Sequence, residues 1–404
     1  MENTKIVLIA GNFLFPKGNA AGKRVLGIGY ILKNLGYEVA FAGCDRNRQE
    51  QDIKNTKKKY GDFYYYNFCG NRSARGIMNV KGAFKEFIDV AEDIGEDNIS
   101  LVILYGSPVL ACWISKVLHY GVKRNIPIVF DCVDWIEKSG FDSRIKNIIK
   151  FIDTNYMKRY LALKCDGVIA VSSYLYNYYK HKGCKVIEIP PVGIKRSAIS
   201  ENTRLENKNK KIYFIYAGAL PLSSGLKRKE LKDRIDLSVE LVAELKKNGI
   251  DFVFDIYGIE KEIYKRVIPE HVKIIDKELS GNIVFHGVVS NNEVCKAFER
   301  ADFMLLNRSV TKVTTAGFPS KISESLCMGV PVIVNDTSNL NDYIKNYKNG
   351  LIISFDQELA VKEISELCMN RGKINKMKEN CLKECVFDYH RYEDKMKLFL
   401  QKLR

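Results

Sequence analysis

Short apolar runs alternate with longer amphipathic segments along the chain, and most of these runs end at a glycine or a polar residue. In the first half, strands are expected over 5–10, 36–42, 101–105, 126–131, 167–171 and 186–189. A helix over 23–35 connects the first two of these strands. An order of strand, helix and strand favours a parallel sheet, so the first half is predicted to be a doubly wound α/β domain.

The same pattern starts again after a polar, lysine-rich stretch over 190–211, which is typical of an interdomain linker. Strands are expected over 212–217, 252–257, 283–285, 303–306, 330–334 and 351–353, and helices over 234–248 and 293–301. The chain therefore predicts two Rossmann-like domains, 1–195 and 196–404, that face a cleft. The tail over 387–403 has apolar residues at helical spacing and is expected to pack back on the first domain.

The segment from Ala316 to Ile333 contains the closest grouping of candidate functional residues. It predicts a loop, a short helix with Ser320 as N-cap, a left-handed stop at Gly329 and a buried strand. Lys321 and Glu324 are three positions apart and share a face of the helix. The free N–H groups at the start of a helix suit a phosphate. A capped helix with two solvated charges explains the same residues, and both interpretations stay open.

Composition narrows the function classes. The chain has 404 residues, of which 46% are hydrophobic and 28% charged, as in ordinary globular proteins, and its formal net charge is +16. A basic protein can bind nucleic acid, an anionic membrane or a phosphorylated substrate. No nucleic-acid-binding motif accompanies the scattered lysines, so we expect solvated faces or a peripheral membrane contact, and no nucleic acid. No apolar run is long enough for a membrane span or resembles a signal peptide, so we expect a cytoplasmic protein, including at the inner face of the plasma membrane.

The cysteines favour reduced thiols rather than disulfides or a metal site. Eleven cysteines, an odd number, are spread without regular spacing and mostly lie in apolar segments. Cys381 and Cys385 are four positions apart, but no second pair or histidine cluster completes a zinc site. We therefore expect no zinc site at these cysteines.

The chain resembles a known family in its order of strands and helices and at several short motifs. The run Tyr216-Ala-Gly218, the pair Lys232-Asp233 and the segment 316–333 are similar to the retaining glycosyltransferases of family four, which have the GT-B fold. The variant Gly-Phe-Pro-Ser-Lys and the run Asp131-Cys-Val-Asp-Trp135 resemble a bacterial branch that makes surface polysaccharides such as capsule or lipopolysaccharide. The resemblance implies metal-independent transfer of a sugar, with retention and no cofactor, from a nucleotide-diphosphate sugar such as a UDP-sugar to a saccharide or lipid-linked saccharide.

The motif and the resemblance together give three groups of candidate residues. The residues expected to act in catalysis are Lys232, Lys321 and Glu324. The residues expected to bind the donor are Gly22, Gly218, Arg308, Phe318, Pro319, Ser320 and Ile322. The residues expected on the acceptor side are Arg24, Asp134 and Trp135. The lysines would offset charge on the departing diphosphate, and the glutamate would accept hydrogen bonds from ribose or sugar hydroxyls. For Asp134 a helix-capping role, and for Trp135 a position in the core, are equally open.

The chain departs from the family pattern at two positions. Ala316 stands where a first glutamate is expected, eight positions before Glu324, and Ala219 stands where arginine is frequent. A cation of the cluster 227–229 could replace that arginine. These departures keep open a non-catalytic subunit that binds a nucleotide sugar. The two-lobed scaffold also leaves a nucleotide-sugar epimerase open. An epimerase needs acid and base groups in the cleft, and the predicted loops supply few.

Overall fold

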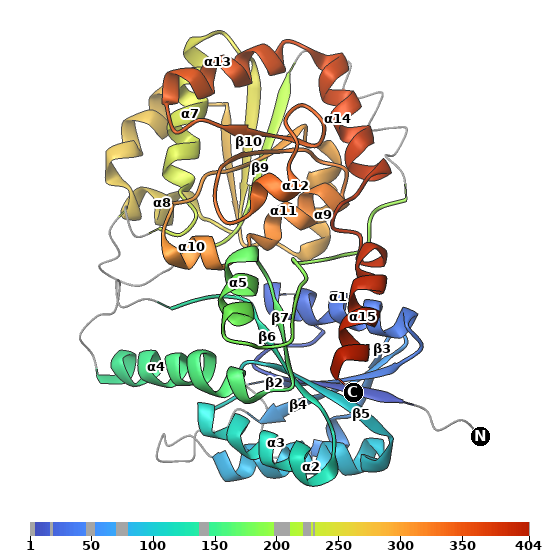
Figure 1. Ribbon diagram of the computed structural model, residues 1–404. Coiled ribbons are helices and arrows are strands. Elements are labelled where there is room, and N and C mark those ends of the chain that lie inside the picture. Colours follow the sequence, from blue (N-terminus) through green and yellow to red (C-terminus); the bar gives the residue numbers. More distant parts are fainter. Residues whose placement is uncertain are drawn as a thin grey trace. The chain divides into compact units, whose positions relative to one another are not determined.

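The computed structural model divides into two compact units (Figure 1). It describes residues 5–16, 19–45, 53–69, 80–136, 145–197, 211–220, 228 and 231–403. The first unit comprises Met1–Val192, Ala316–Phe318 and Tyr389–Arg404. The second unit comprises Gly193–Thr315 and Pro319–Asp388. Each unit is built on one sheet flanked by helices, as the alternating pattern predicts.

The first unit contains an eight-stranded sheet in the order β3-β4-β2-β1-β5-β6-β7-β8. Its strands are β1 (Ile6–Gly11), β2 (Glu38–Asp45), β3 (Lys58–Tyr60), β4 (Phe63–Cys69), β5 (Ile99–Tyr105), β6 (Ile128–Cys132), β7 (Gly167–Ala170) and β8 (Val186–Glu188). Neighbouring strands are parallel except β3 and β4, which form an antiparallel edge that the apolar pattern did not predict. Its longer helices are α1 (Ala20–Asn34), α2 (Val80–Ile94), α3 (Ala111–Arg124), α4 (Ile145–Tyr156), α5 (Ser173–His181) and α15 (Glu393–Leu403). All of β1 is buried, because helices cover both faces of a parallel sheet.

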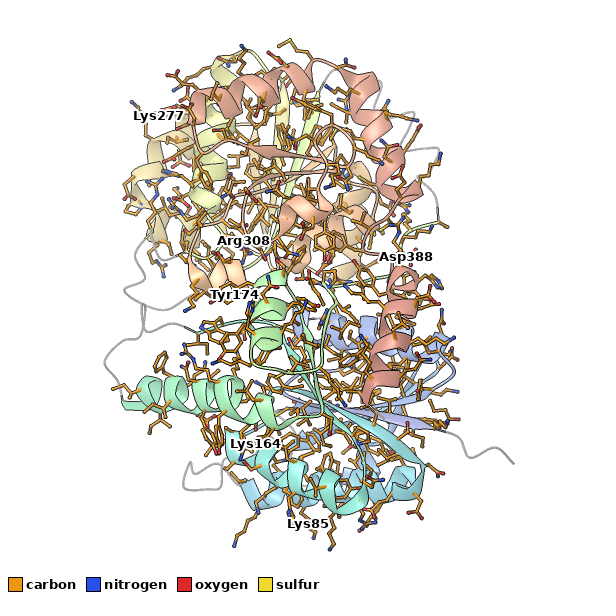
Figure 2. The ribbon with its side chains drawn as sticks, in the orientation of Figure 1. Lys85, Lys164, Tyr174, Lys277, Arg308 and Asp388 are labelled. Carbon is orange, nitrogen blue, oxygen red and sulfur yellow. The ribbon has the colours of Figure 1, made fainter. Side chains whose placement is uncertain are left out.

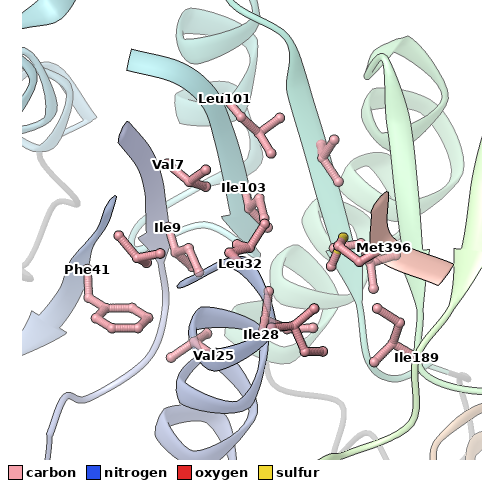
Figure 3. Close-up of a cluster of buried hydrophobic side chains, with 14 of the residues drawn as sticks. Val7, Ile9, Val25, Ile28, Leu32, Phe41, Leu101, Ile103, Ile189 and Met396 are labelled. Carbon is pink, nitrogen blue, oxygen red and sulfur yellow. The ribbon is translucent and has the colours of Figure 1, made fainter. Parts of the chain in front are cut away.

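The C-terminal helix α15 belongs to the hydrophobic core of the first unit. Met396 is fully buried in the cluster that Ile9 of β1, Ile28 of α1 and Ile189 also form (Figure 3). Figure 1 shows α15, in red, beside α1, and the two helices are in contact. The last residues of the chain therefore stabilise the unit that the first residues build.

The second unit contains a six-stranded parallel sheet in the order β11-β10-β9-β12-β13-β14. Its strands are β9 (Ile212–Ala217), β10 (Phe252–Tyr257), β11 (Ile283–Gly287), β12 (Phe303–Leu306), β13 (Val332–Asn335) and β14 (Gly350–Ile353). Its helices are α7 (Ile235–Lys247), α8 (Lys261–Val267), α9 (Asn291–Arg300), α10 (Lys312–Ala316), α11 (Ser320–Cys327), α12 (Leu340–Tyr343), α13 (Gln357–Cys368) and α14 (Arg371–Lys383). The strand order reverses between β9 and β12, and ligands of such sheets bind where the order reverses.

The packing of α15 gives a stability prediction. Met396→Ala removes a fully buried side chain from the core and should lower the free energy of unfolding of the first unit by about 2–5 kcal/mol. The chain's two tryptophans, Trp113 and Trp135, both lie in this unit, so tryptophan fluorescence during urea denaturation reports on it.

The matched control is Leu398→Ala on the same helix, where the side chain is 59% exposed. We expect this control to change the free energy of unfolding by less than about 0.5 kcal/mol. Equal, small effects of both substitutions would show that α15 is not part of the core.

Candidate functional site

The candidate site lies at the carboxyl ends of β9 and β12, where the strand order of the second unit reverses. Gly218 follows β9, and Arg308 comes two residues after β12 (Figure 2). The side chain of Asn335, at the end of β13, accepts a hydrogen bond from the Arg308 backbone N at 2.7 Å and donates one to its carbonyl O at 2.9 Å. These two bonds fix the backbone that carries the arginine.

Asp233 is the centre of the site and was not among the predicted site residues. Its Oδ2 accepts from Nζ of Lys321 at 2.6 Å, and its Oδ1 accepts from Nε of Arg308 at 3.2 Å. The hydroxyl of Tyr216 donates to Oδ2 at 3.4 Å. Burial raises the pKa of Asp233, but the charges of Lys321, Arg308 and the exposed Lys232 outweigh that effect and lower the pKa overall. An ionised carboxylate therefore holds two cations together.

One nitrogen of Arg308 has no partner. The side chain is 2% exposed, and within the described part of the chain no hydrogen-bond acceptor pairs with its Nη1. A buried cationic donor without an acceptor is energetically costly. Burial lowers the pKa of the guanidinium, although Asp233 opposes that shift. An anion that accepts a bond from Nη1 would remove this cost, so the site is prepared for an anionic ligand.

Gly218 leaves the space that Lys321 needs, and Gly258 leaves space for the backbone of Gly218. A Cβ on Gly218 would lie 2.4 Å from Cε of Lys321 and 2.7 Å from the hydroxyl oxygen of Tyr216. Gly258 has a φ of +85°, and a Cβ there would lie 2.6 Å from the carbonyl O of Gly218. Gly218 therefore serves the site by giving Lys321 room to approach, as well as by its place at the end of β9.

Helix α11 carries Lys321 in its first turn. The helix begins at Ser320, so the prediction of Ser320 as the N-cap was wrong by one residue. Pro319 takes that position with an extended backbone (φ −77°, ψ 102°), and the Ser320 carbonyl accepts from the Ser323 hydroxyl at 2.8 Å. The left-handed stop is confirmed, since Gly329 has a φ of +81°.

The other predicted residues of this segment differ in exposure. Glu324 is half-buried on α11, whereas Ile322 is fully buried and Phe318 is buried. A buried isoleucine side chain packs in the core, so Ile322 can reach a donor only through its backbone. Ala316 is fully buried and has no carboxylate to offer.

Arg228, the one residue of the cluster 227–229 that the structure describes, does not contribute its charge to the site. Arg228 pairs with Asp236 at 2.5 Å and with Glu240, both on α7, so its charge is used there. Lys227 and Lys229 lie outside the described residues.

In the first unit, Arg24 is a buried structural residue. Its Nε and Nη2 donate to the two oxygens of Asp131 at 3.1 and 2.9 Å, and its Nη1 donates to two backbone carbonyls after β8 at 2.6 and 2.5 Å. Contact of Arg24 with an acceptor, as the resemblance implies, would require this buried pair to open. Gly22 lies in the first turn of α1, where its N–H donates to the N-cap residue Asn19 at 2.8 Å.

The two other predicted acceptor-side residues also have partners in the first unit. The half-exposed carboxylate of Asp134 forms an ion pair with the buried Lys158, whose Nζ also donates to the Asp134 carbonyl at 3.0 Å. Trp135 is buried, with its ring edge-on to Tyr178 at a centroid distance of 4.9 Å. Asp134 keeps an accessible edge for an acceptor hydroxyl, whereas Trp135 fits the core interpretation.

The described residues contain neither a metal-binding cluster nor a helix suited to span a membrane. No group of three or more His, Cys, Asp or Glu side chains in these ranges could hold a metal ion. None of the helices described has both the length and the apolar character that a membrane span requires.

Comparison with known proteins identifies the fold. HepE from Anabaena, solved in complex with UDP, aligns with a TM-score of 0.63 and 13% identity over 98% of this chain and 100% of its own. A sucrose-phosphate synthase from Thermosynechococcus elongatus aligns with a TM-score of 0.66 and 12% identity over 99% of both chains. The chain has the GT-B fold. Another GT-B structure, WaaG, a glycosyltransferase involved in lipopolysaccharide biosynthesis, aligns with a TM-score of 0.60 and 13% identity over 96% of this chain and 98% of its own.

A family model also matches the part of the chain that contains Arg308 and Lys321. Residues 202–384 match the model of the glycosyl transferases group 1. A search of curated proteins finds no match. The matched region includes Asp233, Arg308 and Lys321, so the candidate site falls inside it.

The lowered pKa of Asp233 predicts a pH-dependent stability difference. An aspartate of this kind stabilises the fold above the pKa of a free aspartate, about 4, and the contribution is lost as the pH falls through the lowered pKa. Asp233→Asn should lower the free energy of unfolding by about 3 kcal/mol at neutral pH, because Lys321 and Arg308 lose their common counter-charge. Urea denaturation followed by circular dichroism should show the difference narrowing below about pH 4.

The control is Asp251→Asn, which removes an exposed partner of Lys211 at 3.7 Å in the same unit. We expect a change of less than about 1 kcal/mol at any of these pH values. An Asp233→Asn variant as stable as wild type at neutral pH would contradict the role of this carboxylate.

Proposed function

We propose that this protein transfers a sugar from a nucleotide-diphosphate sugar to a hydroxyl of a saccharide or lipid-linked saccharide, with retention. The observation that carries the proposal is the buried Nη1 of Arg308, which has no acceptor among the described residues and lies in one cluster with Lys321. A diphosphate offers several charged acceptor oxygens to such donors. The match of residues 202–384 to glycosyl transferases group 1 and the complex of HepE with UDP support a UDP-sugar as donor.

In this proposal the cations act on the leaving group. Negative charge builds on the nucleotide diphosphate as the bond to the sugar breaks, and fixed cations in a buried site stabilise it. Before the donor binds, Asp233 keeps Lys321 and Arg308 in position. The donor phosphates then compete with Asp233 for the ammonium of Lys321, while Lys232 and the first turn of α11 add positive potential.

Retention and independence of metal belong to the same proposal. With alanine at position 316, the chain supplies no carboxylate there to act as a nucleophile. The acceptor hydroxyl can attack the anomeric carbon on the face that the phosphate leaves, and it can give its proton to that phosphate as the bond to the sugar breaks. This route needs no such residue and gives retention. The cations of the site supply the positive charge that a divalent metal would otherwise provide. Glu324 would accept hydrogen bonds from hydroxyls of the ribose or of the transferred sugar.

The acceptor is proposed to belong to cell-surface polysaccharide synthesis, on the cytoplasmic side of the membrane. The structural similarity to WaaG, a glycosyltransferase involved in lipopolysaccharide biosynthesis, supports this class of acceptor. The variant Gly317-Phe-Pro-Ser-Lys321, which resembles a surface-polysaccharide branch, supports it independently. Capsule and lipopolysaccharide saccharides are therefore the first acceptors to test.

A second candidate function is a non-catalytic subunit that binds a nucleotide sugar. The fully buried Ala316, at the place of an expected carboxylate, favours this alternative. Binding of UDP without donor hydrolysis or sugar transfer across a panel of donors and acceptors would support the subunit and contradict the enzyme.

The cationic cluster predicts a loss of nucleotide binding. Lys321→Met should weaken UDP binding by about tenfold or more, because charge-assisted bonds to phosphate are lost while the aliphatic stem is kept. Isothermal titration calorimetry measures the affinity directly. Lys247→Met, at an exposed lysine at the end of α7, should bind UDP as wild type does. Unchanged affinity in Lys321→Met would reject this site for the diphosphate.

Catalysis is tested separately with Glu324→Gln. This variant keeps the size of the side chain and should bind UDP nearly as wild type does, but hydrolyse a UDP-sugar at least about tenfold more slowly. A chelator should leave the wild-type rate unchanged. Wild-type hydrolysis by Glu324→Gln would reject its catalytic role, and loss of turnover with the chelator would contradict metal independence.

A further inference from the structure

Apolar side chains line the solvent side of α4 in the first unit. Four of them, together with Tyr160 of the π-helical turn that follows α4, are between 45% and 61% exposed and form what we call the α4 stripe: Ile148, Ile149, Ile152, Tyr156 and Tyr160. On a helix of 3.6 residues per turn, the first four fall within an arc of about 100°. Elsewhere among the residues described, no ten consecutive positions expose more than two large apolar side chains.

Residues outside the stripe anchor this helix to the unit. Asp153 of α4 accepts a hydrogen bond from the backbone N of Ala111, at the start of α3, at 2.9 Å. The helical path continues through a π-helical turn, η3 (Met157–Leu161), in which Met157 and Leu161 are buried. The helix therefore cannot turn about its axis without breaking these contacts, and the stripe stays on the outside.

The charges around the stripe are positive. Lys150 and Arg159 are exposed, and so is Lys164, which is labelled in Figure 2 and whose Nζ lies 4.4 Å from the centre of the Tyr160 ring. The only carboxylate between Ile148 and Lys164 in the sequence is Asp153, which is engaged with α3. The whole chain carries a net charge of +16.

We propose that the α4 stripe docks on an anionic phospholipid surface, with the helix lying in the plane of the membrane interface. The isoleucines would enter the boundary between headgroups and acyl chains, and the tyrosines, with an apolar ring and a polar hydroxyl, suit the headgroup level. The lysines and the arginine are complementary to anionic headgroups. An acidic protein partner would meet the same cations, but the apolar stripe then needs a matching groove, whereas a lipid surface adapts to it. The proposal does not depend on the donor site.

The test is sedimentation of the full chain with lipid vesicles. Wild type should bind vesicles of phosphatidylcholine mixed with phosphatidylglycerol and bind phosphatidylcholine alone much more weakly. Ile152→Glu should lower binding to the anionic vesicles by at least about tenfold, since it places a carboxylate in the stripe. Leu398→Glu on α15 is the matched control, because that leucine is 59% exposed and Ile152 is 61% exposed. The control should bind like wild type.

Three outcomes would overturn the proposal. These are absence of vesicle binding by wild type, equal loss in both variants, and an unaffected Ile152→Glu variant. A wild-type dimer that Ile152→Glu converts to a monomer, without vesicle binding, would assign the stripe to a second copy of the chain instead. UDP affinity should be the same in wild type and Ile152→Glu, so failure of the membrane proposal and failure of the donor site are separable.

Discussion

The carboxylate of Asp233 is the interaction on which the chemistry of the second unit depends. It bonds to Arg308, 75 positions later, and to Lys321, 88 positions later, and without it the two cations would repel each other at close range. The order of the parallel sheet makes this contact possible, because β12 lies beside β9. The strand order thus brings the counter-charge of Asp233 to the two cations of the proposed anion site.

Two arginines of the described residues, Arg24 and Arg308, are both buried but differ in how fully their hydrogen-bonding capacity is used. Arg24 donates to both oxygens of Asp131 and to two carbonyls, so its hydrogen-bonding capacity is largely used within the first unit. Arg308 donates to one oxygen of Asp233, and its Nη1 has no acceptor among the described residues. Because unsatisfied buried donors are rare, Arg308 rather than Arg24 is the arginine that we propose for binding an anion.

The apolar runs of the sequence located the strands well, and every predicted strand is present within three residues of its expected bounds. The pattern missed β3, which is fully exposed, and β4, in which Tyr64 is 45% exposed and Asn67 interrupts the apolar run. For the site, local motifs pointed to Lys321, Gly218 and Arg308, whereas Asp233 was overlooked. Its role depends on a contact between distant positions that helical or strand periodicity does not encode. The buried pair of Arg24 was missed for the same reason.

A crystal structure of the protein with UDP tests the central claim most directly. Our account predicts that the phosphate oxygens accept hydrogen bonds from Nη1 of Arg308 and from Nζ of Lys321, and that Lys321 loses its bond to Asp233. A structure with UDP bound elsewhere, in which the pair of Lys321 and Asp233 is intact and Nη1 of Arg308 is still without an acceptor, would contradict it.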